Sequence, residues 1–463
     1  MALKRREEEP SGDKKKKKRV GFSAIDSGIE ANECIKIFLV RSEEEVGASS
    51  HNTVDPVDLN QFFGEDGKIY GYKGLKINVW LSIISFHACA EITFETSVDG
   101  GKGITDLEPC LQKLFGESLL EMKEFLQSFS SECQYIRNVV SNGTVVLCKA
   151  GEEDDTGSTI EVIRMGLNNL PVGTLYSRLV PLVLLFVEGG RSVDITDPGW
   201  DIYFVVKKTS DQTGDTLIEL LGFATVYRFY HYPDSTRLRI SQILVLPPYQ
   251  GQGHGRHLIE SVNSIAISEN LHDVTAEEPS DYLQHLRLCM DSLRLLTFSP
   301  VRTAVTSAAA HLQEVNPPKK ASKAQLAPPA HLAEDVRDKL KIGRKQLLRC
   351  WEVLLYLSVD PKDSKSLESF RSWVSDRVRD EILGKDFGGK EKQLVEVPND
   401  YNPEMSFVVF MSQDGSEGSG RGQEQDQEEL LNKVVDEEME EIAESAKRVS
   451  SLRETQEVLH ILG

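Results

Sequence analysis

The segment RLRISQILVLPPYQGQGHGRHLIESV, residues 237–262, constrains the fold of this chain more than any other part of it. It begins with an apolar run rich in isoleucine, leucine and valine, which predicts a buried strand over residues 237–246. Two prolines make a turn, and a glycine-rich loop leads directly into a predicted helix over residues 253–269 with one apolar face. This order predicts a layered fold in which a helix packs against a sheet.

The glycine-rich loop has the chemistry of an anion-binding site. Glycines let backbone amides converge, and the start of a helix adds about half a unit of positive charge. The loop lacks the Lys-Ser or Lys-Thr of a Walker P-loop, and its glycine spacing does not fit a dinucleotide fingerprint. A phosphorylated ligand is therefore expected here, and the alternative is a glycine turn that binds nothing. The loop residues are Gln250, Gly251, Gln252, Gly253, His254 and Gly255.

Several separated motifs resemble one family of enzymes. The loop is similar to the Q/R-x-x-G-x-G/A pyrophosphate loop of the GNAT superfamily of acetyl-CoA-dependent N-acetyltransferases. The stretch VTAEEPS, residues 274–280, resembles the strand of type B histone acetyltransferase catalytic subunits that ends in an acidic pair before Pro-Ser. The stretches QFFG (61–64) and GYKGLK (71–76) resemble the N-terminal domain of that family, and residues 227–233 resemble its substrate-side strand. The resemblance covers roughly residues 30–360.

The resemblance implies a mixed α/β (α+β) fold of the GNAT type, with a mixed central sheet, an N-terminal α+β domain and a C-terminal helical region. Composition shifts divide the chain further. We expect a disordered basic arm (1–29), an N-terminal substrate-side domain (30–150), a linker or insertion (151–174), an acetyl-CoA-binding domain (175–300), a Pro/Ala-rich linker (301–330), a helical domain (331–411) and an acidic tail with a helix (412–463).

The resemblance also assigns catalytic roles. Glu277 matches the general base of the family. A base is needed because a free lysine, with a pKa of about 10.4, is almost wholly protonated at pH 7. We expect burial, the adjacent Glu278 and the more distant Glu188 to make Glu277 a stronger base. The alternatives are an acidic pair that caps a turn and, for Glu188, a surface residue at the end of a helix.

Cofactor and substrate contacts follow from the same resemblance. Backbone groups where two parallel strands diverge would hold acetyl-CoA, the loop amides would hold its pyrophosphate, and His254 would supply only its backbone. Ordinary strand packing is the alternative for the aromatic residues, and Arg228 is an unexpected cation for a site that binds a basic peptide. The expected cofactor residues outside the loop are Ile243, Leu244, Val245 and Arg256, and the expected tail contacts are Glu65, Asp66, Tyr227, Arg228 and Phe229.

The implied activity is transfer of acetyl from acetyl-CoA to lysines on the N-terminal tail of free, newly made histone H4, in a ternary complex and without a metal ion. The implied partners are histone H3, paired with H4, and a WD-repeat histone-binding chaperone. Two other functions remain open: a histone-binding module without turnover, and an acetyltransferase for small amines.

Composition limits the partners and the compartment. The formal net charge is −20, which argues against general binding to nucleic acid. The longest apolar run, residues 179–187, is too short to span a membrane. The seven cysteines are widely spaced without a C-x-x-C pair, so we expect buried free thiols. The cation run at residues 14–19 resembles a nuclear localisation signal, and we expect the protein in nucleus and cytoplasm.

Overall fold

The computed structural model describes residues 27–48, 53–57, 59–63, 66–150, 157–210, 216–312, 325–382, 392–396, 407–411 and 421–462. The chain forms two compact units. Unit 1 comprises the described residues of Met1–Cys133 with Arg178–Arg191, and unit 2 those of Gln134–Ser177 with Ser192–Gly463. Most of the expected basic arm lies outside the described residues.

Unit 1 is built around a four-stranded sheet in the order β3-β2-β6-β7. Apolar residues at helical spacing over residues 106–129 predict one helix, but a 3-10 turn at Gly116–Ser118 separates two helices, because Gly116 adopts φ +55°. The elements are β1 (Ile29–Glu30), α1 (Ala31–Cys34), β2 (Ile35–Val40), η1 (Glu43–Glu45), β3 (Thr53–Val54), η2 (Asn60–Phe62), β4 (Lys68–Ile69), β5 (Tyr72–Lys73), β6 (Lys76–Ser82), β7 (Ala88–Thr93), β8 (Thr96–Ser97), α2 (Leu107–Phe115), η3 (Gly116–Ser118) and α3 (Met122–Ser131).

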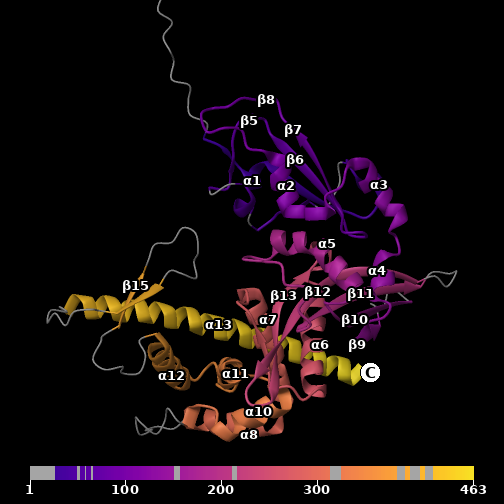
Figure 1. Cartoon of the computed structure of the whole chain (residues 1–463). Coiled ribbons are helices and arrows are strands. Elements are labelled where there is room, and N and C mark those ends of the chain that lie inside the picture. The colour runs from indigo at the N-terminus through magenta and orange to yellow at the C-terminus, as the bar shows by residue number, and fades with distance from the viewer. Residues whose placement is uncertain are drawn as a thin grey trace, which may run out of the picture. The chain divides into compact units, whose positions relative to one another are not determined.

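Unit 2 contains a six-stranded sheet in the order β14-β13-β12-β11-β10-β9. Neighbouring strands are antiparallel except β13 and β14, which are parallel. Helix α6 packs across the sheet, and Figure 1 shows it beside β9 and β10. The elements are α4 (Tyr135–Val140), β9 (Thr144–Ala150), β10 (Ser158–Gly166), β11 (Trp200–Ser210), β12 (Thr216–His231), β13 (Ser235–Val245), η4 (Pro247–Tyr249), α6 (His254–Ser268) and β14 (Val274–Ala276).

Helix α5 (Leu170–Phe186) contributes residues to both units. It is longer than the apolar segment 179–187 that predicts it. The expected linker over 151–174 is wrong for most of its length, because β10 pairs with both β9 and β11 and α5 already begins at Leu170. Val162 in β10 is 0% exposed. The acidic residues that suggested a loop, 151–156, lie outside the described residues.

The C-terminal part of unit 2 is a helical layer with one shared apolar core. The expected linker over 301–330 is wrong up to residue 312, because α8 buries Val301 and Val305 in that core. The sequence pattern predicts one helix over 334–357, but the helix is broken at Lys341, which adopts φ +59°. The helices are α7 (Asp281–Thr297), α8 (Ser299–Leu312), α10 (Ala330–Leu340), α11 (Arg344–Leu357), α12 (Ser364–Ile382) and α13 (Arg421–Leu462).

Helix α13 confirms the helix expected in the acidic tail, and Figure 1 shows it running along α7, α11 and α12, which it contacts. Its start at Arg421 falls within a Gly- and Ser-rich stretch for which the composition predicts disorder. Two strands not expected in this region, β15 (Lys392–Glu396) and β16 (Phe407–Met411), form a hairpin. None of the described helices is both long and apolar enough to cross a membrane.

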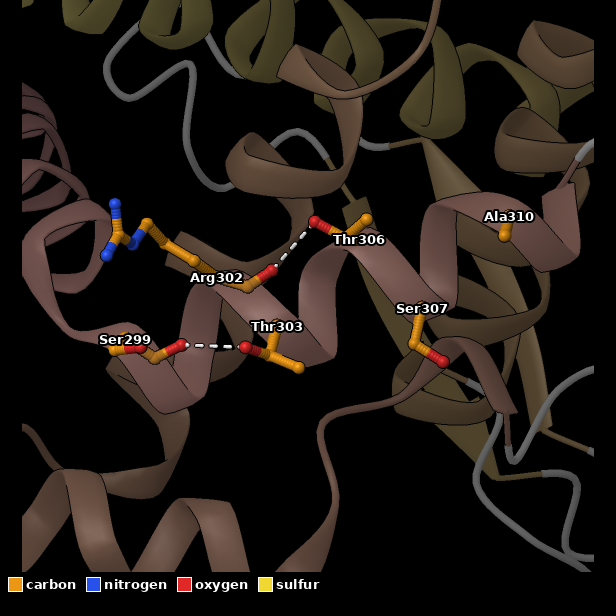
Figure 2. A pocket seen from close by; sticks show the side chains of 6 residues that line it. All are labelled: Ser299, Arg302, Thr303, Thr306, Ser307 and Ala310. Atoms are coloured by element: carbon orange, nitrogen blue, oxygen red, sulfur yellow. Dashed lines mark hydrogen bonds between the residues drawn. The ribbon is translucent and has the colours of Figure 1, made fainter.

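The outer face of α8 forms a shallow hollow (Figure 2). Its two threonine hydroxyls donate to carbonyl groups of the same helix, Thr303 to Ser299 and Thr306 to Arg302. Both hydroxyls therefore form their hydrogen bonds within the helix. The lining residues are Ser299, Arg302, Thr303, Thr306, Ser307 and Ala310.

All seven cysteines are free thiols. Four are buried, as expected: Cys34, Cys89, Cys289 and Cys350. Cys110 is half-buried, and the expected burial is wrong for Cys133 and Cys148, which are exposed.

Candidate active site

Strands β13 and β14 diverge in the way that the family resemblance implies. Their parallel pairing ends at Ile240 and Ala276, and the backbone N–H of Glu277 then donates to the Ile240 carbonyl at 2.9 Å. β13 continues to Val245 and pairs there only with β12. In the described part of the chain, the edge of residues 243–245 that faces away from β12 therefore has no strand partner. Such an edge can bind the amides of an extended ligand.

The glycine loop between β13 and α6 leaves room for a ligand. Gly251 and Gly253 adopt φ +76° and +86°, and a β-carbon added to either would meet no atom within 4 Å. Their backbone conformation, and not close packing, requires glycine. No side chain caps the N-terminus of α6, where Gly253 is the N-cap residue. Uncapped amides at a helix start are suited to phosphate binding.

Two glutamine side chains of this loop fold back, one onto the end of β13 and one onto the turn η4. Gln250 donates from Nε2 to the Val245 carbonyl at 2.9 Å, and Gln252 donates to the Pro248 carbonyl at 3.2 Å. These bonds fix the loop against the strand. The His254 side chain is buried, with 6% of the residue exposed, which agrees with a role for its backbone alone.

Two cations meet at the first turns of α6. Arg256 donates from Nε to Glu260 at 2.7 Å, and Lys149 of β9 donates to the same carboxylate at 3.0 Å. Burial alone would raise the pKa of Glu260, but the hydrogen bonds from Arg256 and Lys149 outweigh it and lower the pKa. Burial, reinforced by Lys149, lowers the pKa of His257 to about 4. This turn therefore carries a net positive charge at pH 7, and the sequence reasoning overlooked Lys149 and Glu260.

Glu277 lies at the end of β14 with its side chain exposed, so the expected burial is wrong. The hydroxyl of Ser241 donates to Oε2 of Glu277 at 2.8 Å. Glu278 adopts φ +36° directly before Pro279, a conformation that costs a non-glycine residue about 1–3 kcal/mol. The cap of α7 is Ser280, whose hydroxyl accepts from the Leu283 N–H at 3.4 Å. The acidic pair therefore does not cap this helix.

Aromatic side chains continue the face of the sheet on which Ser241 lies. Buried and half-exposed residues alternate along β13, which places Arg239 and Ser241 on its half-exposed face. Tyr227 is opposite Arg239, and cross-strand partners share a face. The rings of Tyr227 and Phe229 are 4.6 Å apart, and the Arg239 guanidinium lies 4.4 Å from the Phe229 ring. Tyr227 also donates to Asp197 at 2.9 Å.

Arg228 points to the opposite face, which corrects its expected contact with a peptide. It donates to Asp201 and to Glu269 at the end of α6, each at 2.9 Å. Arg164 of β10 also donates to Asp201 at 2.9 Å and is ion-paired with Glu269. Burial would raise the pKa of Glu269, but the bonds from both arginines lower it. Arg228 and Arg164 together therefore join β10, β11 and β12 to the end of α6.

The remaining expected residues belong to unit 1. Asp66 accepts from the Tyr70 hydroxyl, which is the main reason that its pKa is lowered. Glu65 lies outside the described residues. Glu188 is exposed in the turn after α5. The substrate roles of these residues remain predictions.

Comparison with known proteins identifies the family. Residues 27–188 match the family described as histone acetyl transferase HAT1 N-terminus, and residues 194–286 match the acetyltransferase (GNAT) family. The chain is 51% identical over 460 residues to the histone acetyltransferase type B catalytic subunit of Zea mays, covering 97% of each chain. This chain belongs to the family of type B histone acetyltransferase catalytic subunits. It is 48% identical to the subunit of Arabidopsis thaliana, covering 97% of this chain and 98% of that one.

More distant members of the type B histone acetyltransferase family match most of the chain. The human subunit is 27% identical over 359 residues, which is 75% of this chain and 79% of that one. The protein is accordingly an acetyltransferase of GNAT fold that uses an acyl-CoA. The open edge of β13, the glycine loop and the uncapped start of α6 fit such a ligand.

Proposed function

We propose that this protein transfers acetyl from acetyl-CoA to lysine side chains on the N-terminal tail of free, newly synthesised histone H4. The observation that carries the proposal is the half-exposed sheet face of unit 2. There Glu277 is hydrogen-bonded to Ser241, next to the point where β13 and β14 diverge, and Tyr227 and Phe229 lie farther along the same face. One surface thus combines a proton acceptor, a place for a thioester and aromatic contacts.

The chemistry requires proton removal and correct placement. Acetyl-CoA supplies an activated acyl group as a thioester. The backbone edge of residues 243–245 orients the pantetheine arm, and the loop amides with Arg256 balance the charge of the phosphates. Glu277 accepts a proton from the lysine ammonium, directly or through a water molecule. The amine nitrogen then bonds to the acyl carbon and gives up its second proton to solvent, the C–S bond breaks, and the departing thiolate takes a proton from solvent, without an acyl-enzyme.

The choice of substrate is supported by charge and by the aromatic face. A chain with a net charge of −20 attracts a strongly basic protein. The ring faces of Tyr227 and Phe229 can pack against a glycine-rich tail and against cations. The relatives quoted above are named as histone acetyltransferases. We extend the proposal to histone H3 as the partner of H4, a WD-repeat histone-binding chaperone, and a place in nucleus and cytoplasm.

The test is transfer of radiolabelled acetyl by the purified full chain. An H4-tail peptide is compared with spermidine and with the same peptide carrying arginine in place of every lysine. We expect label only on the lysine peptide. Preferential labelling of spermidine would instead identify a small-amine acetyltransferase, and binding of the peptide without any labelling would identify a module that only holds histones.

A further inference from the structure

β13 carries a β-bulge next to Glu277. Thr225 and Val226 are consecutive in β12, yet they are opposite Gln242 and Ile240 of β13, so Ser241 is the extra residue. A bulge bends a strand and redirects a side chain, and bulges are frequent beside active sites. Here the redirected side chain is the one whose hydroxyl donates to Glu277.

The residue after the bulge is fixed from the interior of unit 2. Gln242 is 5% exposed, and its Oε1 accepts a hydrogen bond from the Tyr176 hydroxyl at 3.0 Å. Tyr176, in α5, is 1% exposed and accepts from the backbone N–H of Val193 at 3.0 Å. Loss of a buried hydrogen bond is costly, so this link favours one register of the strand. In this register Ser241 is the bulged residue, and its hydroxyl meets the Glu277 carboxylate.

Glu277 has few other constraints. β14 is only three residues long, and its parallel pairing ends one residue before Glu277. The exposed side chain has several rotatable bonds, and most of its rotamers would leave the carboxylate away from an incoming amine. One hydrogen bond from a fixed hydroxyl restricts these rotamers.

We propose that Ser241 and Gln242 form a positioning device for Glu277, with Tyr176 as its buried anchor. The inference rests on the proposed role of Glu277 as the general base. None of the three positioning residues takes part in proton transfer. Their effect is to keep the carboxylate where the lysine ammonium arrives.

The test is steady-state kinetics of the full chain with acetyl-CoA and an H4-tail peptide. Ser241→Ala should lower kcat about tenfold, the expected effect of one hydrogen bond to a charged group that is partly exposed to water. The KM values for both substrates should stay within about twofold, because the proposed role of the hydroxyl is only to orient Glu277. Ser241→Thr keeps the hydroxyl and should recover most of the activity. Wild-type kcat in Ser241→Ala, or no recovery in Ser241→Thr, would overturn the inference.

A double variant separates this inference from the function on which it rests. Ser241→Ala should have no further effect in a Glu277→Gln background, since the hydroxyl acts only through that carboxylate. Additive losses would overturn the positioning role. Full activity of Glu277→Gln alone would instead overturn the proposed base. If Glu277→Gln is inactive and Ser241→Ala is unaffected, only the positioning role fails.

Tyr176→Phe tests the anchor without touching the surface. The substitution removes one hydroxyl and keeps the ring in the core, so the fold should persist, as circular dichroism can verify. We expect a fall in kcat of about threefold with an unchanged peptide KM, smaller than for Ser241→Ala because the effect is indirect. This variant keeps the proposal testable if Ser241→Ala does not fold. An unchanged kcat would remove Tyr176 from the device.

Discussion

The two faces of β12 have different partners, although they are built from consecutive residues. Tyr227 and Phe229 lie on the half-exposed face with Arg239, and they form ring contacts open to a ligand. Arg228, between them, lies on the other face and donates hydrogen bonds to Asp201 and Glu269. The pleat of the strand thus separates the proposed recognition face, formed by Tyr227, Phe229 and Arg239, from the stabilising face, which carries Arg228. Substitutions on the face of Tyr227 and Phe229 should alter the kinetics of peptide acetylation. Substitutions of Arg228 on the other face should alter the free energy of unfolding.

The largest effect is expected at Glu277, at the end of the recognition face. Glu277→Gln removes the proton acceptor and should lower kcat at least about 100-fold, the usual contribution of a general base. Acetyl-CoA affinity, measured by calorimetry, should be retained because the loop and the β13 edge are intact. Glu278→Gln is the matched control and should lose far less activity. Equal losses in both variants would mean that the acidic pair acts as a unit.

Phe229→Ala tests whether the proposed recognition face binds the peptide. Loss of a ring that packs against a basic peptide should raise the peptide KM about fivefold, with kcat and Tm nearly unchanged. Tyr230→Ala is the control: Tyr230 is 72% exposed, and the pleat places it on the Arg228 face. If Tyr230→Ala raises the peptide KM as much as Phe229→Ala, the two faces do not differ in recognition.

Arg228→Met tests the stabilising face. The substitution leaves Asp201 and Glu269 with one arginine fewer and should lower the free energy of unfolding by about 2 kcal/mol, measured by chemical denaturation. Peptide KM should not change. Arg228→Lys keeps the positive charge but lacks the planar guanidinium with its several donors, and it should lower the free energy of unfolding by an intermediate amount. A raised peptide KM at unchanged stability would restore the tail contact expected from sequence.

The smallest effect concerns acid sensitivity on the α6 side of the sheet. Burial lowers the pKa of His257 to about 4, whereas an unfolded chain would have a histidine pKa near its ordinary value of 6.5. Between these values the unfolded state binds more protons, so stability should fall as the pH is lowered from about 6.5 to about 4. Tm measured across this range should decrease less in His257→Asn. An unchanged slope would mean that His257 is not the group responsible.

Features that depend on neighbouring residues were predictable from the sequence. The strand, glycine loop and helix around residues 237–262 are present as the pattern indicates. The divergence of β13 from β14, which depends on pairing between distant residues, was implied only by the family resemblance. The pattern missed β10, since its role as an inner strand depends on pairing with β9 and β11. It also gave no sign that Lys341 would end a helix in a left-handed conformation.

Side-chain partners were decided only by the tertiary structure. Ser241 and Glu277 are separated by 36 residues and meet because β13 and β14 pair in parallel, and Arg228 reaches Glu269 because α6 ends beside β12. The sequence by itself determined where backbone amides can bind an anion, since glycine spacing and a helix start act locally. Which carboxylate is oriented by a serine hydroxyl and which arginine is paired with Asp201 and Glu269 depended on the register of strands, a property of the whole sheet.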